Sequence, residues 1–251
     1  MQIQTIFKRY EIKYVLTKQQ KEEVMKYMEA YMIPDAFGNS TIRNLYYDTD
    51  TYRLIRKSLE KPVYKEKLRV RSYKLVSGDD MVFVELKKKY QSVVYKRRLT
   101  LPEADTMKWL AGGSCPMKGQ IADEISYFLD YYENLHPVSY ISYDRCAFFA
   151  KENSDFRISF DENIMGRQTD LSLQREPGGE ALLGRDLSLM EIKTAGAIPM
   201  WLVEFLTENH IYKTSFSKYG KAYTDYIFNR SSRPEMMKKI EYQREEMLKY
   251  A

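Results

Sequence analysis

The sequence has very few of the residues that build zinc sites and histidine-dependent active sites. Its 251 residues include only two cysteines and two histidines. Cys115 and Cys146 lack the close spacing of zinc ligands, and His136 and His210 lie far apart along the chain. The sequence therefore excludes a His/Cys zinc site and gives no indication of a cysteine–histidine nucleophile pair. The scarcity of cysteine also fits a reducing compartment.

Long apolar runs are missing as well. No stretch approaches the roughly 18 apolar residues that a membrane-spanning helix needs, and the N-terminal MQIQTIFKRYEIKY has no continuous apolar signal-peptide core. Glycine-rich phosphate-binding loops of the Walker and Rossmann types are absent too. We therefore expect no membrane span, a cytoplasmic location and no standard nucleotide-binding loop.

Charge is abundant and nearly balanced. Hydrophobic residues make up 44% and charged residues 30%, which is typical of a globular protein. The chain has 40 Lys and Arg against 35 Asp and Glu, so the net charge of +5 matters less than where the basic residues lie. No linker divides the sequence, and we expect a single domain over residues 1–251. A charged helix is predicted over 234–251, with a surface for a partner protein or a homo-oligomer.

Strand patterns outnumber helix patterns in the sequence. Alternating apolar and polar residues predict strands over 6–16, 41–49, 66–75, 81–90, 92–101, 136–150, 156–168 and 188–194. Helical spacing and capping signals predict helices over 17–32, 104–111, 120–134, 199–210 and 217–229, and a short helix or a turn over 50–60. A long connection is expected over 170–186. This order favours an antiparallel α+β fold over a doubly wound parallel sheet.

Basic residues gather on one face of at least six predicted strands. Successive side chains of a strand point to opposite faces, so Arg69 and Arg71 oppose Leu68 and Val70. The tripeptides EIK, ELK and EIK repeat this arrangement at residues 11–13, 85–87 and 191–193. One reading is a sheet with its polar face in water. Because like charges on neighbouring strands repel, we expect instead a closed β-barrel with a basic, phosphate-binding interior and helices outside.

Eight segments resemble, in order, the motifs of the polyphosphate polymerase (VTC) domain of the triphosphate tunnel metalloenzyme (CYTH-like) superfamily. They are LYYDTDTYRL, LRVRSY, FVELKKK, YKRRL, YDRCAFF, FRISFD, MEIKT and FSKYG, within a match over residues 6–225. The first strand departs from the E-x-E-x-K signature of the superfamily, because Arg9 stands at its first carboxylate position. This departure favours the polymerase branch over a two-metal hydrolase.

The resemblance implies a role for each charged face. The residues implied in catalysis are Arg69, Arg71, Lys193 and Lys218. The residues implied in phosphate binding are Lys13, Lys87, Lys96, Arg98, Arg145, Arg157 and Ser217. Glu191 and Glu85 are the implied ligands of Mn²⁺ or Mg²⁺. Glu85 and Glu11 stay open, since either could hold the metal or pair with a neighbouring lysine. Ordinary structural roles stay open: Glu191 could pair with Lys193, and Arg145 or Lys218 could be solvated surface charge.

The implied reaction is metal-dependent phosphoryl transfer from ATP to a growing polyphosphate chain. Water as the acceptor would make the protein a triphosphatase or polyphosphatase, and a binding module for polyphosphate or nucleotides would use the same residues without turnover. A specific nucleic-acid partner is not expected, because such a protein needs an open basic surface with exposed aromatic residues. Asp48 is expected to cap a turn, and Trp109 and Trp201 are expected in the core.

Overall fold

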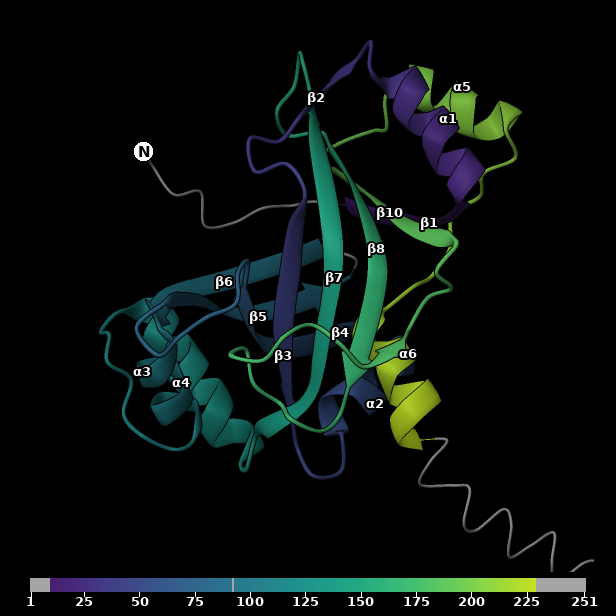
Figure 1. The fold of residues 1–251 in the computed structure, drawn as a ribbon. Helices are drawn as coiled ribbons and strands as arrows, with labels where there is room; N and C mark the ends of the chain where they lie inside the picture. Colours follow the sequence, from purple (N-terminus) through teal and green to yellow (C-terminus); the bar gives the residue numbers. More distant parts are fainter. Residues whose placement is uncertain (1–9, 92, 229–251) are drawn as a thin grey trace, which may run out of the picture.

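The computed structural model describes residues 10–91 and 93–228, whose strands form one antiparallel sheet (Figure 1). The main strand order is β1-β10-β8-β7-β3-β4-β5-β6; β2 pairs with β7, and β9 with β8. The strands are β1 (Tyr10–Thr17), β2 (Met32–Pro34), β3 (Ser40–Asp48), β4 (Tyr64–Ser72), β5 (Met81–Tyr90), β6 (Val93–Pro102), β7 (His136–Ala150), β8 (Arg157–Arg167), β9 (Glu180–Ala181) and β10 (Leu187–Thr194).

The helices lie between these strands, close to the predicted positions. They are α1 (Lys18–Met28), α2 (Arg53–Leu59), α3 (Glu103–Leu110), α4 (Gln120–Tyr132), α5 (Met200–Glu208) and α6 (Lys218–Ala222), which continues as a π-helix over Tyr223–Phe228. The capping box at the start of α1 is confirmed, since Thr17 and Gln20 exchange side-chain-to-backbone hydrogen bonds. None of the helices described is long and apolar enough to cross a membrane. The helix predicted over 234–251 lies outside the described residues.

The predicted closed barrel is wrong: the sheet is curled but open. Its two edges are β1 and β6, and no backbone pairing joins them in the described part of the chain. The free edge of β1 is used by another segment, because the Thr214 N–H donates to the Lys13 carbonyl at 2.7 Å. Side chains cross the remaining gap, where Lys87 of β5 pairs with Glu11 of β1 at 2.8 Å. Alternation along strands predicts a charged face, but not whether the sheet edges meet.

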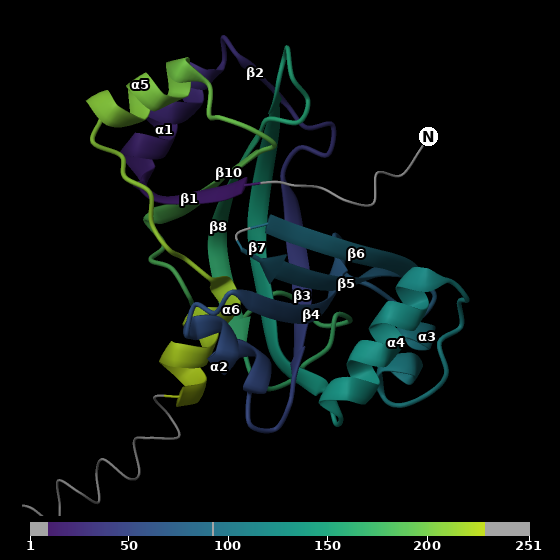
Figure 2. The same cartoon turned by 180° about the vertical axis from the view of Figure 1, so that it is seen from behind.

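Three apolar clusters hold helices against the sheet. Helices α3 and α4 pack on β4 and β5 through the fully buried Trp109 and Ile125. Helices α1 and α5 pack on β1, β8 and β10 at the opposite end of the sheet (Figure 1). By contrast, α2 and α6 lie together on the concave side (Figure 2). Their residues Ile55 and Tyr219 belong to one apolar cluster with Ile42 of β3. The helices are therefore not all outside, and α6 faces the charged concave surface.

The long connection after β8 is fastened to the sheet. The Arg167 guanidinium stacks over the Tyr140 ring and donates to three backbone carbonyls of this segment. Leu173 and Leu182 from the same segment are fully buried. Trp109 is in the core as expected, whereas Trp201 is only half-buried and stacks on Tyr31 with ring centroids 4.3 Å apart.

Asp48 joins β3, α2 and α6 at the base of the concave side. Its fully buried carboxylate accepts hydrogen bonds from the backbone N–H groups of Leu54 and Ile55 and from the Tyr219 hydroxyl, at 2.8–2.9 Å. This confirms its expected capping role. Because α6 carries residues of the charged surface, Asp48 also fixes the position of that helix.

We expect Asp48→Asn to lower the free energy of unfolding by about 2 kcal/mol. The substitution turns one buried carboxylate oxygen, which accepts two hydrogen bonds, into an amide NH₂ group that cannot accept them. Urea denaturation followed by circular dichroism measures the change. The matched control is Asp50→Asn, whose side chain is 83% exposed and whose effect should stay within about 0.5 kcal/mol. Equal effects of the two substitutions would contradict this role of Asp48.

Candidate functional site

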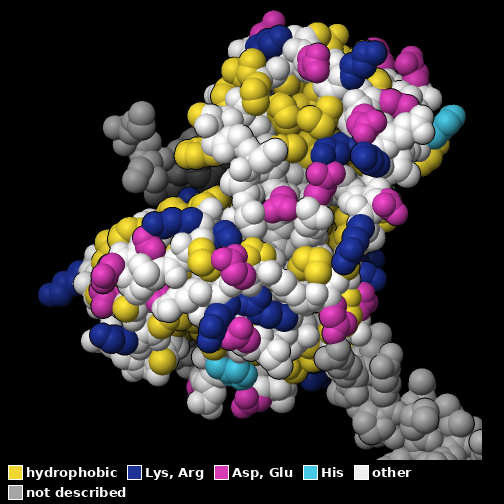
Figure 3. Space-filling model, viewed as in Figure 1, with side chains coloured by type: hydrophobic (Ala, Val, Ile, Leu, Met, Phe, Trp, Pro, Cys, Tyr) yellow, Lys and Arg dark blue, Asp and Glu magenta, His cyan; other side chains and the backbone are white. Residues whose placement is uncertain are grey.

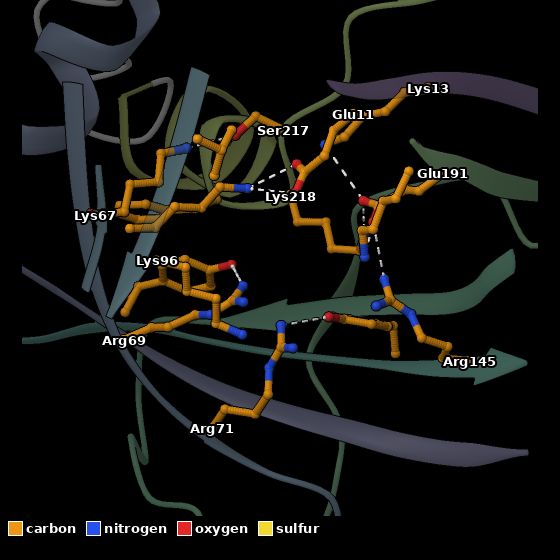
Figure 4. Close-up of a pocket in the computed structure, with 16 residues that line it drawn as sticks. Glu11, Lys13, Lys67, Arg69, Arg71, Lys96, Arg145, Glu191, Ser217 and Lys218 are labelled. Carbon is orange, nitrogen blue, oxygen red and sulfur yellow. Dashed lines mark hydrogen bonds and ion pairs between the residues drawn. The ribbon is translucent and has the colours of Figure 1, made fainter. Parts of the chain in front are cut away.

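A cavity of about 320 Å³, called here the inner cavity, lies on the concave side of the sheet (Figure 4). Its basic lining residues are Lys13, Lys67, Arg69, Arg71, Lys87, Lys96, Arg145, Lys193 and Lys218. Among the described residues, its lining carboxylates are Glu11 and Glu191. The remaining lining residues are Tyr46, Val94, Tyr143, Ser217 and Tyr219. The excess of basic over acidic side chains gives the inner cavity a strongly positive potential.

Glu85 lies beneath the wall of the inner cavity and holds basic residues from two strands. It is 1% exposed and accepts from Arg69 Nε and Arg98 Nε, each at 2.8 Å, while Lys96 Nζ lies 2.5 Å away. Burial alone would raise the pKa of Glu85. The positive charges around it, above all those of Arg69 and Arg71, instead hold this pKa well below its usual range. Glu85 therefore positions the basic side chains of β4 and β6 and does not line the cavity.

Glu191 forms a second anchor, on the β10 side of the inner cavity. Arg145 Nη2 and Lys218 Nζ lie 3.2 and 3.3 Å from its carboxylate oxygens, and Lys13 lies at 3.5 Å. Its alternative partner Lys193 is farther away, at 3.7 Å. Burial would raise the pKa of Glu191, yet Lys218 and Lys13 keep it well below its usual range. This carboxylate stays ionised and faces the inner cavity.

Asp161 binds two of the basic residues that also contact Glu191. It is fully buried on β8, and its carboxylate accepts from Arg145 and Lys218. Burial would raise its pKa, but Lys218 and Arg145 lower it. Lys218 in turn has its pKa raised by Asp161 and Glu191, against the effect of burial. Lys218 is therefore a permanently charged residue at the start of α6.

Lys67 contrasts with these paired residues. Its Nζ donates to Ser217 Oγ at 3.1 Å, and no carboxylate in the described part of the chain forms an ion pair with it. Burial, followed by repulsion from Lys13 and Lys87, lowers the pKa of Lys67 to about 7. Burial likewise lowers the pKa of Lys193 to about 8, although Glu191 and Glu11 partly oppose the shift. A lysine amine with such a lowered pKa gains a proton readily when a bound anion stabilises its charged form.

The inner cavity fits a divalent cation only in part. Among the described residues, no group of three or more His, Cys, Asp or Glu side chains is close enough together to hold a metal. Glu11 and Glu191 lie on the same face of neighbouring strands, where Glu11 is opposite Lys193 and Glu191 is opposite Lys13. Mg²⁺ is commonly held by one or two carboxylates together with substrate phosphates, and this pair fits that mode. A metal cage made of protein alone does not fit.

The structure brings most of the predicted site residues together. Those lining the inner cavity are Lys13, Arg69, Arg71, Lys87, Lys96, Arg145, Glu191, Lys193, Ser217 and Lys218. Glu85 lies beneath the wall, and Arg98 stacks on Phe83 at 4.5 Å while bonding Glu85. Arg157 is exposed and donates to the Ser154 carbonyl, outside the cavity lining. Arg9 lies outside the described residues.

Several residues of the site were not predicted from the sequence. Lys67 lies two residues before Arg69 on β4 and so points to the same face of the strand. The alternation that predicted Arg69 therefore also predicts Lys67. Asp161 of β8 is another, and its role depends on its buried partners Arg145 and Lys218, which strand alternation does not show. Tyr46 and Tyr143 accept hydrogen bonds from Arg69 and Arg71 at 3.2 and 3.1 Å. With 22 tyrosines in the chain, nothing in the sequence distinguishes these two.

A family model agrees with this arrangement. The model of the VTC domain matches residues 8–226. The chain belongs to the VTC-domain family. The match confirms the resemblance inferred from the ordered motifs, and it contains every residue that lines the inner cavity. The inner cavity is thus a feature of the VTC domain of this protein.

A solved structure resembles this VTC domain in fold. A Bacillus halodurans protein described as a candidate adenylate cyclase has a TM-score of 0.54 at 15% identity, over 85% of this chain and 96% of that one. A Vibrio parahaemolyticus protein with the same description has a TM-score of 0.46 at 13% identity, over 87% and 98% of the chains. At 15% identity, the likeness to the Bacillus halodurans structure shows the fold alone. A comparison with curated proteins finds no significant match.

The lowered lysine pKa values predict that anion binding takes up protons. At pH 8, Lys67 is mostly neutral in the free VTC domain, and a bound polyanion raises its pKa. Tripolyphosphate affinity should therefore fall as the pH rises from 7 to 9. Calorimetry in two buffers of different ionisation enthalpy measures the uptake, and Lys67→Gln should take up about one proton fewer per ligand than the wild type. Identical uptake by both proteins would contradict this assignment.

Proposed function

We propose that this VTC-domain protein transfers the γ-phosphoryl group of a nucleoside triphosphate such as ATP to the end of a growing polyphosphate chain. One observation carries the proposal: among the described residues, nine basic side chains from separate strands and α6 converge on one cavity with two carboxylates. Several phosphoryl groups in a row supply the negative charge that this cavity lacks. A single phosphate or a neutral substrate would leave most of these basic residues without an anionic partner.

The three arginines of the inner cavity supply directed hydrogen bonds. Arg69 and Arg71 come from β4, and Arg145 comes from β7 across the cavity. Each guanidinium is held by a neighbour: Glu85 holds Arg69, Asn44 holds Arg71, and Asp161 holds Arg145. Donors fixed before the substrate arrives stabilise charge on the transferring phosphoryl group without reorganising. The remaining N–H groups of these forks are the proposed contacts to phosphoryl oxygens.

The lysines complete the charge balance. Lys193 and Lys218 flank Glu191, and Lys96 lies against Glu85 on the opposite wall. Placed on both sides of the substrate, they are proposed to neutralise the phosphates and to align donor and acceptor. Because alignment of two phosphoryl groups removes much of the entropic barrier to their reaction, no protein nucleophile is required.

Glu191 and Glu11 are the proposed holders of a divalent cation, Mn²⁺ or Mg²⁺. When bound beside the phosphates, such a cation supplies further charge neutralisation and polarises the phosphoryl oxygens. Glu85 is not included, because its carboxylate is buried beneath the wall and does not line the inner cavity. Arg157 is likewise not included among the phosphate contacts, since it lies away from the inner cavity.

Product analysis tests the proposal. The purified protein is incubated with ATP and Mn²⁺, and the products are separated into polyphosphate and inorganic phosphate. We expect polyphosphate from the wild type and a loss of roughly a hundredfold in rate for Arg69→Ala and Glu191→Gln, because each removes fixed charge at the reacting group.

The matched controls are Arg175→Ala and Glu204→Gln, on exposed residues remote from the inner cavity, and both should keep the wild-type rate. Inorganic phosphate as the sole product would make water the acceptor and replace the transferase with a triphosphatase. Tight ATP binding without any product would leave a binding module. Full activity in both site variants would refute the assignment of the inner cavity.

A further inference from the structure

A groove with a volume of about 970 Å³, called here the α4 groove, lies between α3, the end of α4 and the turn after β3. In the described part of the chain, it shares no lining residue with the inner cavity. Its apolar base is formed by the buried or partly buried side chains of Trp109, Leu110, Leu129 and Leu135. The α4 groove is therefore a separate feature of the surface, and the proposed reaction does not use it.

The charged side chains of the α4 groove are acidic. Among the described residues that line it, Asp50, Asp130 and Glu133 are exposed carboxylates, and none is Lys or Arg. The partner found for Asp50 is His136, whose Nε2 lies 3.7 Å away. On the face seen in Figure 3, acidic and basic side chains are otherwise mixed. In a chain with a net charge of +5, this groove favours a ligand that combines apolar groups with positive charge.

The described part of the chain ends near the α4 groove. Phe228 packs against Tyr223 with ring centroids 6.2 Å apart, and Tyr223 contacts Tyr52 at 5.3 Å. Tyr52 comes two residues after Asp50, in the turn between β3 and α2. This turn lies between the end of α4 and the helix that ends at Phe228 (Figure 1, Figure 2). The 23 residues that follow Phe228 therefore start at the same end of the molecule as the groove.

The sequence after Phe228 has the chemistry that complements the α4 groove. Its first half, NRSSRPEMMKKI over 229–240, contains four basic residues and one acidic residue. Met236, Met237 and Ile240 in this stretch flank Lys238 and Lys239. Methionine side chains fill irregular apolar gaps and make favourable contacts with aromatic rings. Fully extended, 23 residues reach about 75 Å, more than the roughly 30 Å diameter of a small domain, so length does not limit the contact.

We propose that residues 229–240 bind in the α4 groove of their own chain. The apolar side chains of this stretch contact the apolar base, and Lys238 and Lys239 pair with the carboxylates on the rim. Because the stretch is covalently attached, its effective concentration at the groove is high and modest contacts suffice. The same stretch from a second copy of the chain is the competing occupant.

Such binding fastens the helix that carries Lys218. This helix starts at Lys218, whose side chain lines the inner cavity, and continues as a π-helix to Phe228. Asp48 holds its first turn through Tyr219. A C-terminal stretch bound in the α4 groove holds its other end. The groove thus acts as the attachment point of a strap that steadies a helix of the candidate site.

Disulfide formation in the full chain tests this placement. Cys115 is a free thiol that lines the α4 groove, and the one other cysteine of the sequence is Cys146 on β7. Met237→Cys adds a thiol to the proposed strap, and mild oxidation of the dilute protein is followed by mass spectrometry of tryptic peptides. We expect an intramolecular disulfide to Cys115, formed about tenfold faster than in Lys249→Cys, whose thiol lies outside the binding stretch.

Charge reversal on the rim separates binding from chance collision. Asp130→Lys/Glu133→Lys, combined with Met237→Cys, should slow the disulfide about tenfold through loss of two attractive charges. Positive charge is favourable at the C-terminal end of α4, so this variant should stay folded, which circular dichroism verifies. The matched control, Asp123→Lys/Glu152→Lys, changes two exposed residues outside the groove and should keep the rate within about twofold.

Amide hydrogen exchange tests the strap itself. Release of the strap by Asp130→Lys/Glu133→Lys should speed exchange over Tyr223–Phe228, because one end of that helix is no longer held. Exchange as slow as in the wild type would refute the strap. In the oxidation experiment, a disulfide found only between two chains would assign the groove to a second copy. Equal rates for Met237→Cys and Lys249→Cys, equal rates with and without charge reversal, or preferential reaction with Cys146 would refute the groove as the binding site.

Discussion

Ion pairs between buried carboxylates and basic side chains hold the concave face of this protein together. Glu85, Asp161 and Glu191 each contact two or more basic residues, and all three are buried. Without them, the basic strands of the sheet would repel one another and leave desolvated charge unpaired, which is strongly destabilising. These carboxylates use up only part of the positive charge. The surplus faces the inner cavity, and it is the surplus that the proposed substrate neutralises.

The open sheet turns this charged face into an accessible one. The free edges of β1 and β6 leave a gap that Glu11 and Lys87 bridge through their side chains. A side-chain bridge separates more easily than a ladder of backbone hydrogen bonds, and both of its residues line the inner cavity. The surplus charge and the open sheet edges thus both favour the access of an anionic ligand to the concave face.

Much of the fold and site was predictable from the sequence. The alternation in LRVRSY and MEIKT correctly separated charged from apolar faces, and ordered motifs identified the VTC-domain family. Closure of the sheet was not predictable, because it depends on backbone partners such as Thr214, which lies in an irregular segment far from β1 in the sequence. The partners of Glu85 were not predictable from the sequence either. A strand pattern places a carboxylate on one face of a strand, but only the register between neighbouring strands shows which basic residues surround it.

Thermal unfolding with tripolyphosphate tests the central claim, that surplus charge in the inner cavity exists to bind a chain of phosphates. A ligand at 100 times its dissociation constant stabilises the native state by about 2.7 kcal/mol, which raises the melting temperature by roughly 5 °C or more in a protein of this size. We predict such a rise with tripolyphosphate, and little change with orthophosphate or with sodium chloride of equal ionic strength. An unchanged melting temperature at millimolar tripolyphosphate, or an equal rise with sodium chloride, would contradict the account.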